Sequence, residues 1–251
     1  VQIVVQVGFP VLLGWWLTRR FGGDKVDTLR IFLGGMVGYA VAQAVLLAAS
    51  QLVSSVTLAE LARQYPVAVS SLGFGVAVGV LEELARFGVL RLWLRDVRSW
   101  GHGLIFGAGH GGAEGIFTGL VGAVWFMTMQ SLRAGPPVGE QLSDADKANL
   151  DQVVSAYWST PWQTPLLSVL QQVFMIVLSL GLATLVMRAF LSGRLIYLPA
   201  AMIVHSVATA SAVYLGQVSP SLSVVVSGAF AVLGILIVVR YAEPQAPPDA
   251  P

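Results

Sequence analysis

The chain has 251 residues, of which 56% are hydrophobic and only 11% are charged, and its formal net charge is +1. A soluble domain carries about 25% charged residues, so this chain cannot cover a water-facing surface and must expose apolar surface to lipid. The near-neutral charge gives no indication of nucleic-acid binding. Because the sequence has no cysteine, disulfides, iron–sulfur clusters, thiolate zinc sites and a cysteine nucleophile are excluded.

Long, continuous apolar runs predict an all-α fold, a polytopic transmembrane helix bundle. Transmembrane β-strands alternate apolar and polar positions over about 10 residues, whereas a membrane-spanning helix needs about 20 apolar residues in a row. We expect about seven spans, near residues 2–18, 31–54, 66–90, 101–132, 161–189, 195–215 and 220–239. The first run is expected to be a span and not a signal peptide, because no basic region precedes it.

The distribution of basic residues predicts the orientation of the bundle. With an odd number of spans, most of these residues fall on one side of the membrane. The positive-inside rule then places the N-terminus outside and the C-terminus in the cytoplasm. The basic residues on the predicted cytoplasmic side are Arg19, Arg20, Lys25, Arg30, Arg91, Arg95, Arg98, Arg188, Arg194 and Arg240. Those on the opposite side are Arg63, Arg133 and Lys147.

We expect a single transmembrane helical domain over residues 1–242, in the plasma membrane of a prokaryote. A proline-rich tail over residues 243–251 is expected to be disordered. The longest polar stretch, 133–160, is predicted to be an extracytoplasmic loop. Within it, SDADKANLDQVVSAYW predicts a short amphipathic helix, capped by Ser143 with Asp146 three residues later. We expect this helix to lie at the membrane interface, and a lid or substrate-docking element is the alternative.

The apolar spans contain a small set of ionisable side chains, each costing roughly 2.5–3.5 kcal/mol at mid-membrane. They are Glu82, Glu83 and Arg86 in the third span, His102, His110 and Glu114 in the fourth, and His205 in the sixth. Counted from the predicted cytoplasmic ends, all but His102 lie about 6 to 20 Å deep. The similar depths predict one cluster that is shielded from lipid. His102 sits at the interface, where polar groups cost little, and is not expected to belong to it.

The spacing of these residues indicates how the cluster is arranged. Glu82 and Glu83 are both within helical reach of Arg86, at i, i+4 and i, i+3, so the arginine can hold one carboxylate while the other faces a cavity. Two imidazoles with carboxylates suit a divalent metal, and zinc is the expected ion. The expected ligands are His110, His205 and a glutamate, for which Glu83 and Glu114 are the candidates. A remaining glutamate would then take a proton from water. The alternative is a polar network that only holds the helices together.

Two short strings carry a family resemblance: EELAR at 82–86 and FGAGHGGAEGI at 106–116. They resemble the YhfC family of intramembrane metalloproteases. That family is similar to the CPBP group, which includes the CAAX prenyl endopeptidases and bacteriocin-processing or immunity proteins. The group's pattern is two glutamates with a downstream arginine, then FxxxH, then a histidine on a later span, which here fits His205. The arginine is one residue nearer than in the CAAX-type pattern, and Thr209 stands where the CAAX enzymes have an asparagine.

The resemblance implies a metal-dependent endopeptidase that cleaves membrane-associated peptides or proteins inside the bilayer. One glutamate would activate water, the two histidines would hold the metal or orient the water, and the arginine would position the glutamates. The catalytic residues implied are Glu82, Glu83, Arg86, His110 and His205. Glu114 matches the glutamate of the YhfC-like HGGxE string. Two other classes stay open: a non-catalytic scaffold or immunity protein that uses the cluster for packing, and a proton-coupled transporter, against which the lack of inverted repeats argues.

Overall fold

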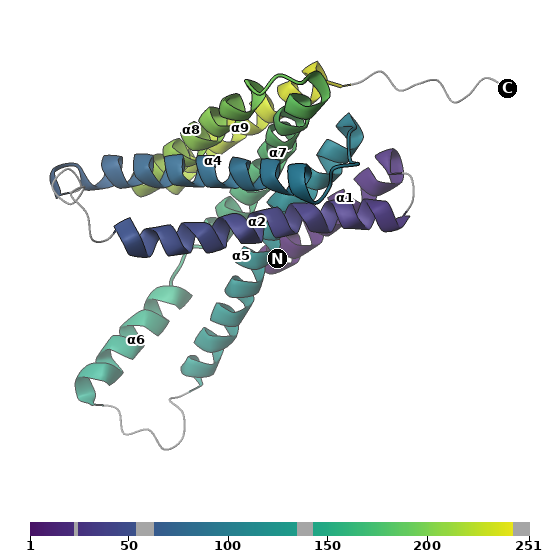
Figure 1. Cartoon of the computed structure of the whole chain (residues 1–251). Coiled ribbons are helices and arrows are strands. Elements are labelled where there is room, and N and C mark those ends of the chain that lie inside the picture. The colour runs from purple at the N-terminus through teal and green to yellow at the C-terminus, as the bar shows by residue number, and fades with distance from the viewer. Residues whose placement is uncertain (23–24, 54–62, 135–142, 243–251) are drawn as a thin grey trace.

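The computed structural model describes residues 1–22, 25–53, 63–134 and 143–242. All regular secondary structure in these ranges is helical (Figure 1), which confirms the predicted fold class. The helices are α1 (Gln2–Phe21), α2 (Lys25–Val53), α4 (Pro66–Leu92), α5 (Trp100–Arg133), α6 (Asp144–Trp158), α7 (Gln163–Ser192), α8 (Tyr197–Val218) and α9 (Pro220–Arg240). The tail that was expected to be disordered, 243–251, lies outside the described residues.

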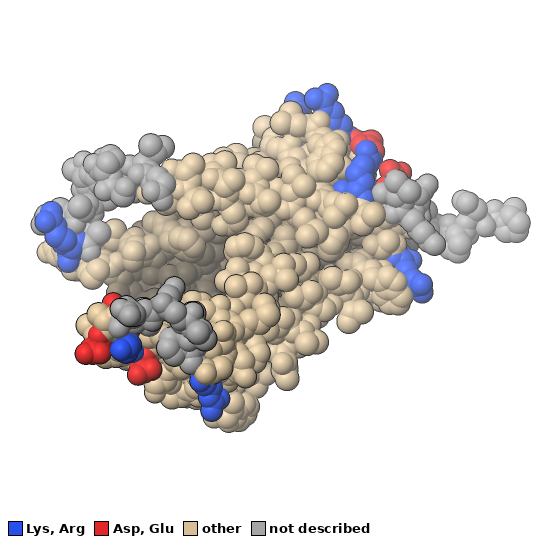
Figure 2. Space-filling view, turned by 90° about the horizontal axis from the view of Figure 1, so that it is seen from below, with Lys and Arg blue, Asp and Glu red and all other residues tan. Residues whose placement is uncertain are grey.

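Six of the described helices are long and apolar enough to cross a membrane, namely α2, α4, α5, α7, α8 and α9. The chain is therefore a multi-pass membrane protein. The expected first span corresponds to α1, which is not among the six, because Gln2, Gln6, Arg19 and Arg20 dilute its apolar residues. Figure 2 shows charged side chains gathered at the ends of the molecule, with an uncharged belt between them. The orientation of the termini stays a prediction.

The bundle is organised around α5 and α7. Helix α5 packs on α1, α2 and α7, while α4 packs on α8 and α7 packs on α9 (Figure 1). A buried apolar core forms where these helices meet, and its fully buried members include Leu90, Leu94, Ile105, Phe106, Leu178 and Leu182. The C-terminal half of α5 runs out of this core beside α6. Glu82, Glu83 and Arg86 of α4, His110 of α5 and His205 of α8 are buried within the packed part of the bundle.

Two close helix contacts beside the ionisable residues depend on glycine. A Cβ atom placed on Gly35 of α2 would lie 2.7 Å from the backbone nitrogen of His110 in α5. A Cβ atom on Gly79 of α4 would lie 2.8 Å from the Cα atom of Ser206 in α8. Non-bonded carbon atoms pack about 3.5–4.0 Å apart, so any larger residue would push these helices apart. Glycine thus lets both histidine-bearing helices approach their neighbours, because Ser206 directly follows His205.

The predicted amphipathic segment is confirmed as the helix α6. The side-chain oxygen of Ser143 accepts a hydrogen bond of 3.1 Å from the backbone nitrogen of Asp146, as expected for a cap, and its hydroxyl donates to the Asp146 carboxylate at 2.6 Å. The helix has no buried residue. The guanidinium of Arg133, at the end of α5, lies 4.8 Å from the centre of the Trp158 ring. The location of α6 at a membrane interface stays a prediction.

Candidate active site

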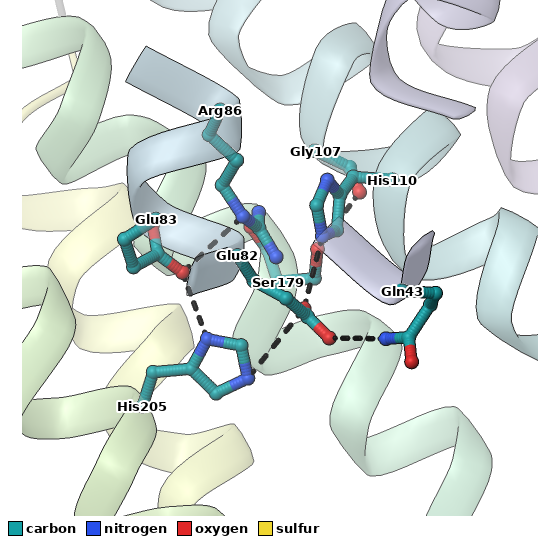
Figure 3. Close-up of polar contacts among 8 residues, drawn as sticks. All are labelled: Gln43, Glu82, Glu83, Arg86, Gly107, His110, Ser179 and His205. Atoms are coloured by element: carbon teal, nitrogen blue, oxygen red, sulfur yellow. Dashed lines mark hydrogen bonds and ion pairs between the residues drawn. The ribbon is translucent and has the colours of Figure 1, made fainter. Parts of the chain in front are cut away.

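Three helices bring their ionisable side chains together in one buried cluster (Figure 3). Helix α4 contributes Glu82, Glu83 and Arg86, α5 contributes His110 and α8 contributes His205. None of the five exposes more than 6% of its surface. The ionisable residues of the third, fourth and sixth expected spans thus lie together in the fold, as the sequence predicted.

Glu83 is the carboxylate held by the arginine. The Nε atom of Arg86 lies 3.2 Å from Glu83 Oε1, and His205 Nδ1 lies 2.8 Å from the same oxygen. The Nη1 atom of Arg86 also donates a hydrogen bond of 3.1 Å to the backbone oxygen of Ser179 in α7. A buried carboxylate and guanidinium are costly unless they are paired and hydrogen-bonded, and here each has both kinds of contact. The sequence left open whether Arg86 pairs with Glu82 or with Glu83, and the fold contains the i, i+3 pair with Glu83.

Glu82 is the carboxylate that faces a cavity. Its Oε1 accepts a hydrogen bond of 3.0 Å from Nε2 of Gln43, and its Oε2 lies 3.0 Å from Nε2 of His110. Nε2 of His205 lies 3.8 Å from the same Oε2 atom. The side chain is therefore fixed from three helices (Figure 3). The two neighbouring glutamates thus have different surroundings, since Glu83 is enclosed by protein and Glu82 borders open space.

The cavity beside Glu82 has a volume of about 230 Å³ and lies among α2, α4, α5, α7 and α8. A water molecule occupies about 30 Å³ in the liquid, so the cavity has room for several. Its polar lining residues are Tyr39, Gln43, Glu82, Glu114, Gln171, His205 and Thr209. The hydroxyl of Thr209 is buried and has no hydrogen-bond partner among the described residues. The cavity thus combines a fixed carboxylate, an imidazole and a free hydroxyl.

Two further predicted residues fall outside the hydrogen-bonded cluster. Glu114 is partly exposed on the cavity wall, near the side chain of Gln172. No hydrogen bond joins it to Glu82 or His110 in the described part of the chain. His102 lies in the first turn of α5, where its backbone nitrogen donates to the capping side chain of Ser99, and it does not reach the cluster. Its separation from the site agrees with the prediction.

Sequence reasoning missed three residues that shape the site. Gln43 holds Glu82, the backbone oxygen of Ser179 accepts from the buried arginine, and the ring of Tyr39 lies edge-on to His110 with centroids 5.7 Å apart. None of these three groups carries a charge at neutral pH, so the cost of burying charge in lipid does not single them out. A survey of every polar side chain in the spans would have included Gln43. Its i, i+4 spacing from Tyr39 would also have placed both residues on one helix face.

The family model of the YhfC intramembrane metalloproteases matches residues 3–229 of the chain. The chain belongs to this family. A protein of Bacillus subtilis (strain 168) described as "Uncharacterized membrane protein YhfC" is 27% identical over 209 residues, which cover 81% of this chain and 78% of that protein. No solved structure matches the chain. The resemblance inferred from the short motifs is therefore confirmed, and the family name suggests a membrane protease.

The name of the family to which this chain belongs also implies a metal. No group of three or more histidine, aspartate or glutamate side chains within the described ranges is arranged to hold a metal ion. The donor chemistry is nevertheless suitable, because Nε2 atoms of His110 and His205 approach one oxygen of Glu82. In addition, Glu83 orients His205 through Nδ1, as carboxylates orient metal-binding histidines. With neutral imidazoles, the two carboxylates and one guanidinium leave a negative charge that a cation would offset. The predicted metal ligands stay a prediction.

Proposed function

We propose that this YhfC-family protein is an intramembrane endopeptidase that hydrolyses peptide bonds in membrane-associated peptides or proteins. The observation that supports this most directly is the difference between the two adjacent glutamates. Glu83 is bound by Arg86 and His205, whereas Glu82 is fixed by Gln43 and His110 and borders the cavity. A fixed carboxylate next to space for water is what a general base requires.

In the proposed reaction, Glu82 takes a proton from a water in the cavity. The water oxygen forms a bond to the scissile carbonyl carbon, and the carbonyl π electrons move onto the carbonyl oxygen. When this oxyanion collapses, the bond between carbon and nitrogen breaks, and Glu82 gives the proton to the departing nitrogen. The products are a carboxylic acid and an amine. Both oxygens of Glu82 have hydrogen-bond partners, which keeps the base in one orientation between the two proton transfers.

The oxyanion needs donors that are already in place before the reaction. Thr209 follows His205 by four residues on α8, so both side chains face the same cavity. The unpartnered Thr209 hydroxyl is available as one donor. Nε2 of His205 supplies a second when the ring is protonated, since its Nδ1 is already paired with Glu83. Glu83 and Arg86 are therefore assigned a positioning role, because they orient His205 and do not border the cavity together with Glu82.

A divalent metal would be held by His110, His205 and Glu82. When bound, such an ion supplies Lewis-acid polarisation of the carbonyl and increases the acidity of water. In that case Glu114, which lines the same cavity, is the remaining carboxylate available for proton transfer. With or without a bound metal, Glu82 borders the cavity and Glu83 pairs with Arg86.

A non-catalytic membrane scaffold is the second candidate function. The favouring observation is that most polar atoms of the cluster already pair with one another, as in a network that only fastens helices together. Such networks hold helices together in membranes. A scaffold, however, has no use for a cavity beside one of its carboxylates or for a buried, unpartnered hydroxyl on a residue that lines this cavity.

The test is hydrolysis by purified protein in lipid vesicles, with a panel of membrane-spanning peptides in water enriched in oxygen-18. We expect new peptide fragments whose C-terminal carboxyl carries the heavy oxygen. Glu82→Gln and His110→Ala should abolish the fragments, and His102→Ala, on the same helix but outside the cluster, should leave them unchanged. Equal cleavage by the Glu82→Gln variant would show that Glu82 is not the base. Absence of cleavage by the unmodified protein, with strong destabilisation by His110→Ala, would favour the scaffold.

A further inference from the structure

An apolar groove lies between α2 and α5 on the outside of the bundle, with a volume of about 700 Å³. Helix α2 lines it with Met36, Val37, Tyr39, Ala40, Gln43 and Leu47. Helix α5 lines it with Ala113, Ile116, Phe117 and Leu120. Val37, Phe117 and Leu120 expose 41%, 60% and 56% of their surface, so the groove opens toward the surroundings of the bundle. Both helices are membrane-spanning candidates, so we expect those surroundings to be lipid.

Two residues belong to both the groove and the catalytic cavity. Tyr39 and Gln43, one turn apart on α2, line both spaces. From this position Gln43 donates its hydrogen bond to Glu82, and Tyr39 packs edge-on against His110. Tyr39 and Gln43 are the only polar side chains among the residues that line the groove. The groove therefore leads from lipid toward the proposed base, and Tyr39 and Gln43 are the two polar side chains that separate it from the catalytic cavity.

The sizes of the two spaces indicate different occupants. The cavity of about 230 Å³ accommodates water and one small side chain but no stretch of peptide. The groove of about 700 Å³ falls within the range of about 300–1,000 Å³ that is usual for ligand sites. A substrate bound in the groove would need to move only past Tyr39 and Gln43 to bring a peptide bond to Glu82. The face of the bundle drawn in Figure 2 is hollowed within its uncharged belt, where a membrane-embedded chain can approach.

We propose that the α2–α5 groove binds the apolar, membrane-embedded stretch next to the scissile bond of a peptide substrate, which enters sideways from the bilayer. This inference rests on the proposed function, because it assigns that activity a route for its substrate. Apolar walls match the side chains of a transmembrane segment. The amide of Gln43 and the hydroxyl of Tyr39 match the backbone hydrogen-bonding groups that an unwound peptide exposes, and such groups are costly in lipid without partners.

A lipid acyl chain is the competing occupant of an apolar groove. It would fit the walls equally well, but it has no hydrogen-bonding group for Tyr39 and Gln43. An acyl chain also gives no reason for the groove to share these two residues with the cavity of the base. A peptide is therefore the occupant that accounts both for the apolar walls and for the two polar side chains shared with the cavity.

The lack of cysteine in the chain allows a direct binding test. Val37 and Val41 lie one turn apart on α2 and expose 41% and 47% of their surface, but only Val37 lines the groove. Single-cysteine variants Val37→Cys and Val41→Cys, each combined with Glu82→Gln, are labelled with bimane in phosphatidylcholine vesicles. The probe is a membrane-spanning leucine/alanine peptide with one central tryptophan, which quenches bimane on contact. We expect saturable quenching at position 37 and only weak, non-saturable quenching at position 41.

A second measurement separates the peptide from lipid. Brominated phosphatidylcholine also quenches bimane, so bound peptide should protect position 37 from brominated chains and leave position 41 unprotected. Replacing Ile116, on the opposite wall, by phenylalanine, which introduces no new quencher, should narrow the groove and raise the peptide Kd by about tenfold. Val121→Phe, on the same helix but outside the lining, should leave the Kd unchanged. Equal quenching at both positions, or strong bromine quenching at position 37 that peptide does not relieve, overturns the proposal. Because the readout is binding by an inactive variant, its outcome is independent of whether the unmodified protein cleaves peptides.

Discussion

Replacement of Arg86 by methionine tests the buried ion pair in this bundle. Arg86 and Glu83 expose only 1% and 0% of their side chains, so the loss of the guanidinium leaves a carboxylate that water cannot reach. His205 remains next to that carboxylate, but the backbone oxygen of Ser179 loses its donor. Removing one partner of a buried pair destabilises a protein by about 3–5 kcal/mol.

The size of this effect can be measured by thermal unfolding in nanodiscs. For a domain of this length, a loss of 1 kcal/mol lowers Tm by roughly 2–4 °C, so we expect Arg86→Met to lower Tm by about 6–20 °C. Arg91→Met is the matched control, because Arg91 is an exposed arginine of the same helix. Exposed substitutions usually change the free energy of unfolding by no more than about 0.5 kcal/mol, or about 2 °C.

The double variant Glu83→Gln/Arg86→Met isolates the pair itself. It removes both charges, so no uncompensated carboxylate remains. More than half of the Tm decrease caused by Arg86→Met alone should therefore be recovered. Contacting residues show interaction energies of about 0.5–3 kcal/mol in such cycles. Two results would refute the reasoning: a shift for Arg86→Met no larger than that for Arg91→Met, or a double variant whose loss equals the sum of the two single losses.

Two other predictions concern the approach of α2 to α5 and the metal. Gly35→Ala should lower the free energy of unfolding by about 1–3 kcal/mol, because its Cβ would overlap the backbone of His110. Gly38→Ala, whose Cβ would lie 3.4 Å from the side chain of the same histidine, should be neutral or stabilising in denaturant titrations. Equal losses of unfolding free energy in the two variants would contradict the close contact at Gly35. Elemental analysis of purified protein should find a divalent metal that His110→Ala and His205→Ala lose and His102→Ala retains, whereas identical metal contents in all three variants would rule out these ligands.

Composition and the spacing of rare polar residues were enough to predict much of this protein. Long apolar runs specify transmembrane helices because only internally hydrogen-bonded backbones are stable in lipid. The cost of burying charge in lipid made Glu82, Glu83 and Arg86 on one run, and the histidines on two others, candidates for a shared cluster. Capping chemistry is equally local, so the helix that begins after Ser143 was also predictable.

The partners within the cluster required the tertiary structure. Helical spacing allows Arg86 to reach either glutamate. The choice of Glu83 follows from the way α4 packs against α8, which brings His205 to the same oxygen, and against α7, whose Ser179 carbonyl accepts from Arg86. The role of Gln43 likewise depends on α2 lying beside α4 and α5, a contact between segments about forty residues apart that no local pattern encodes.

The number of described helices that can cross a membrane, six, follows from length and composition, because the polar residues of α1 dilute its apolar run. The spaces between the helices, in contrast, are decided by the tertiary structure. The cavity beside Glu82 and the groove between α2 and α5 are gaps left by side chains from several helices, so they exist only once those helices are packed. Local chemistry therefore determined which residues enter the membrane interior, and long-range packing decided which of them touch, which face open space and how that space is reached.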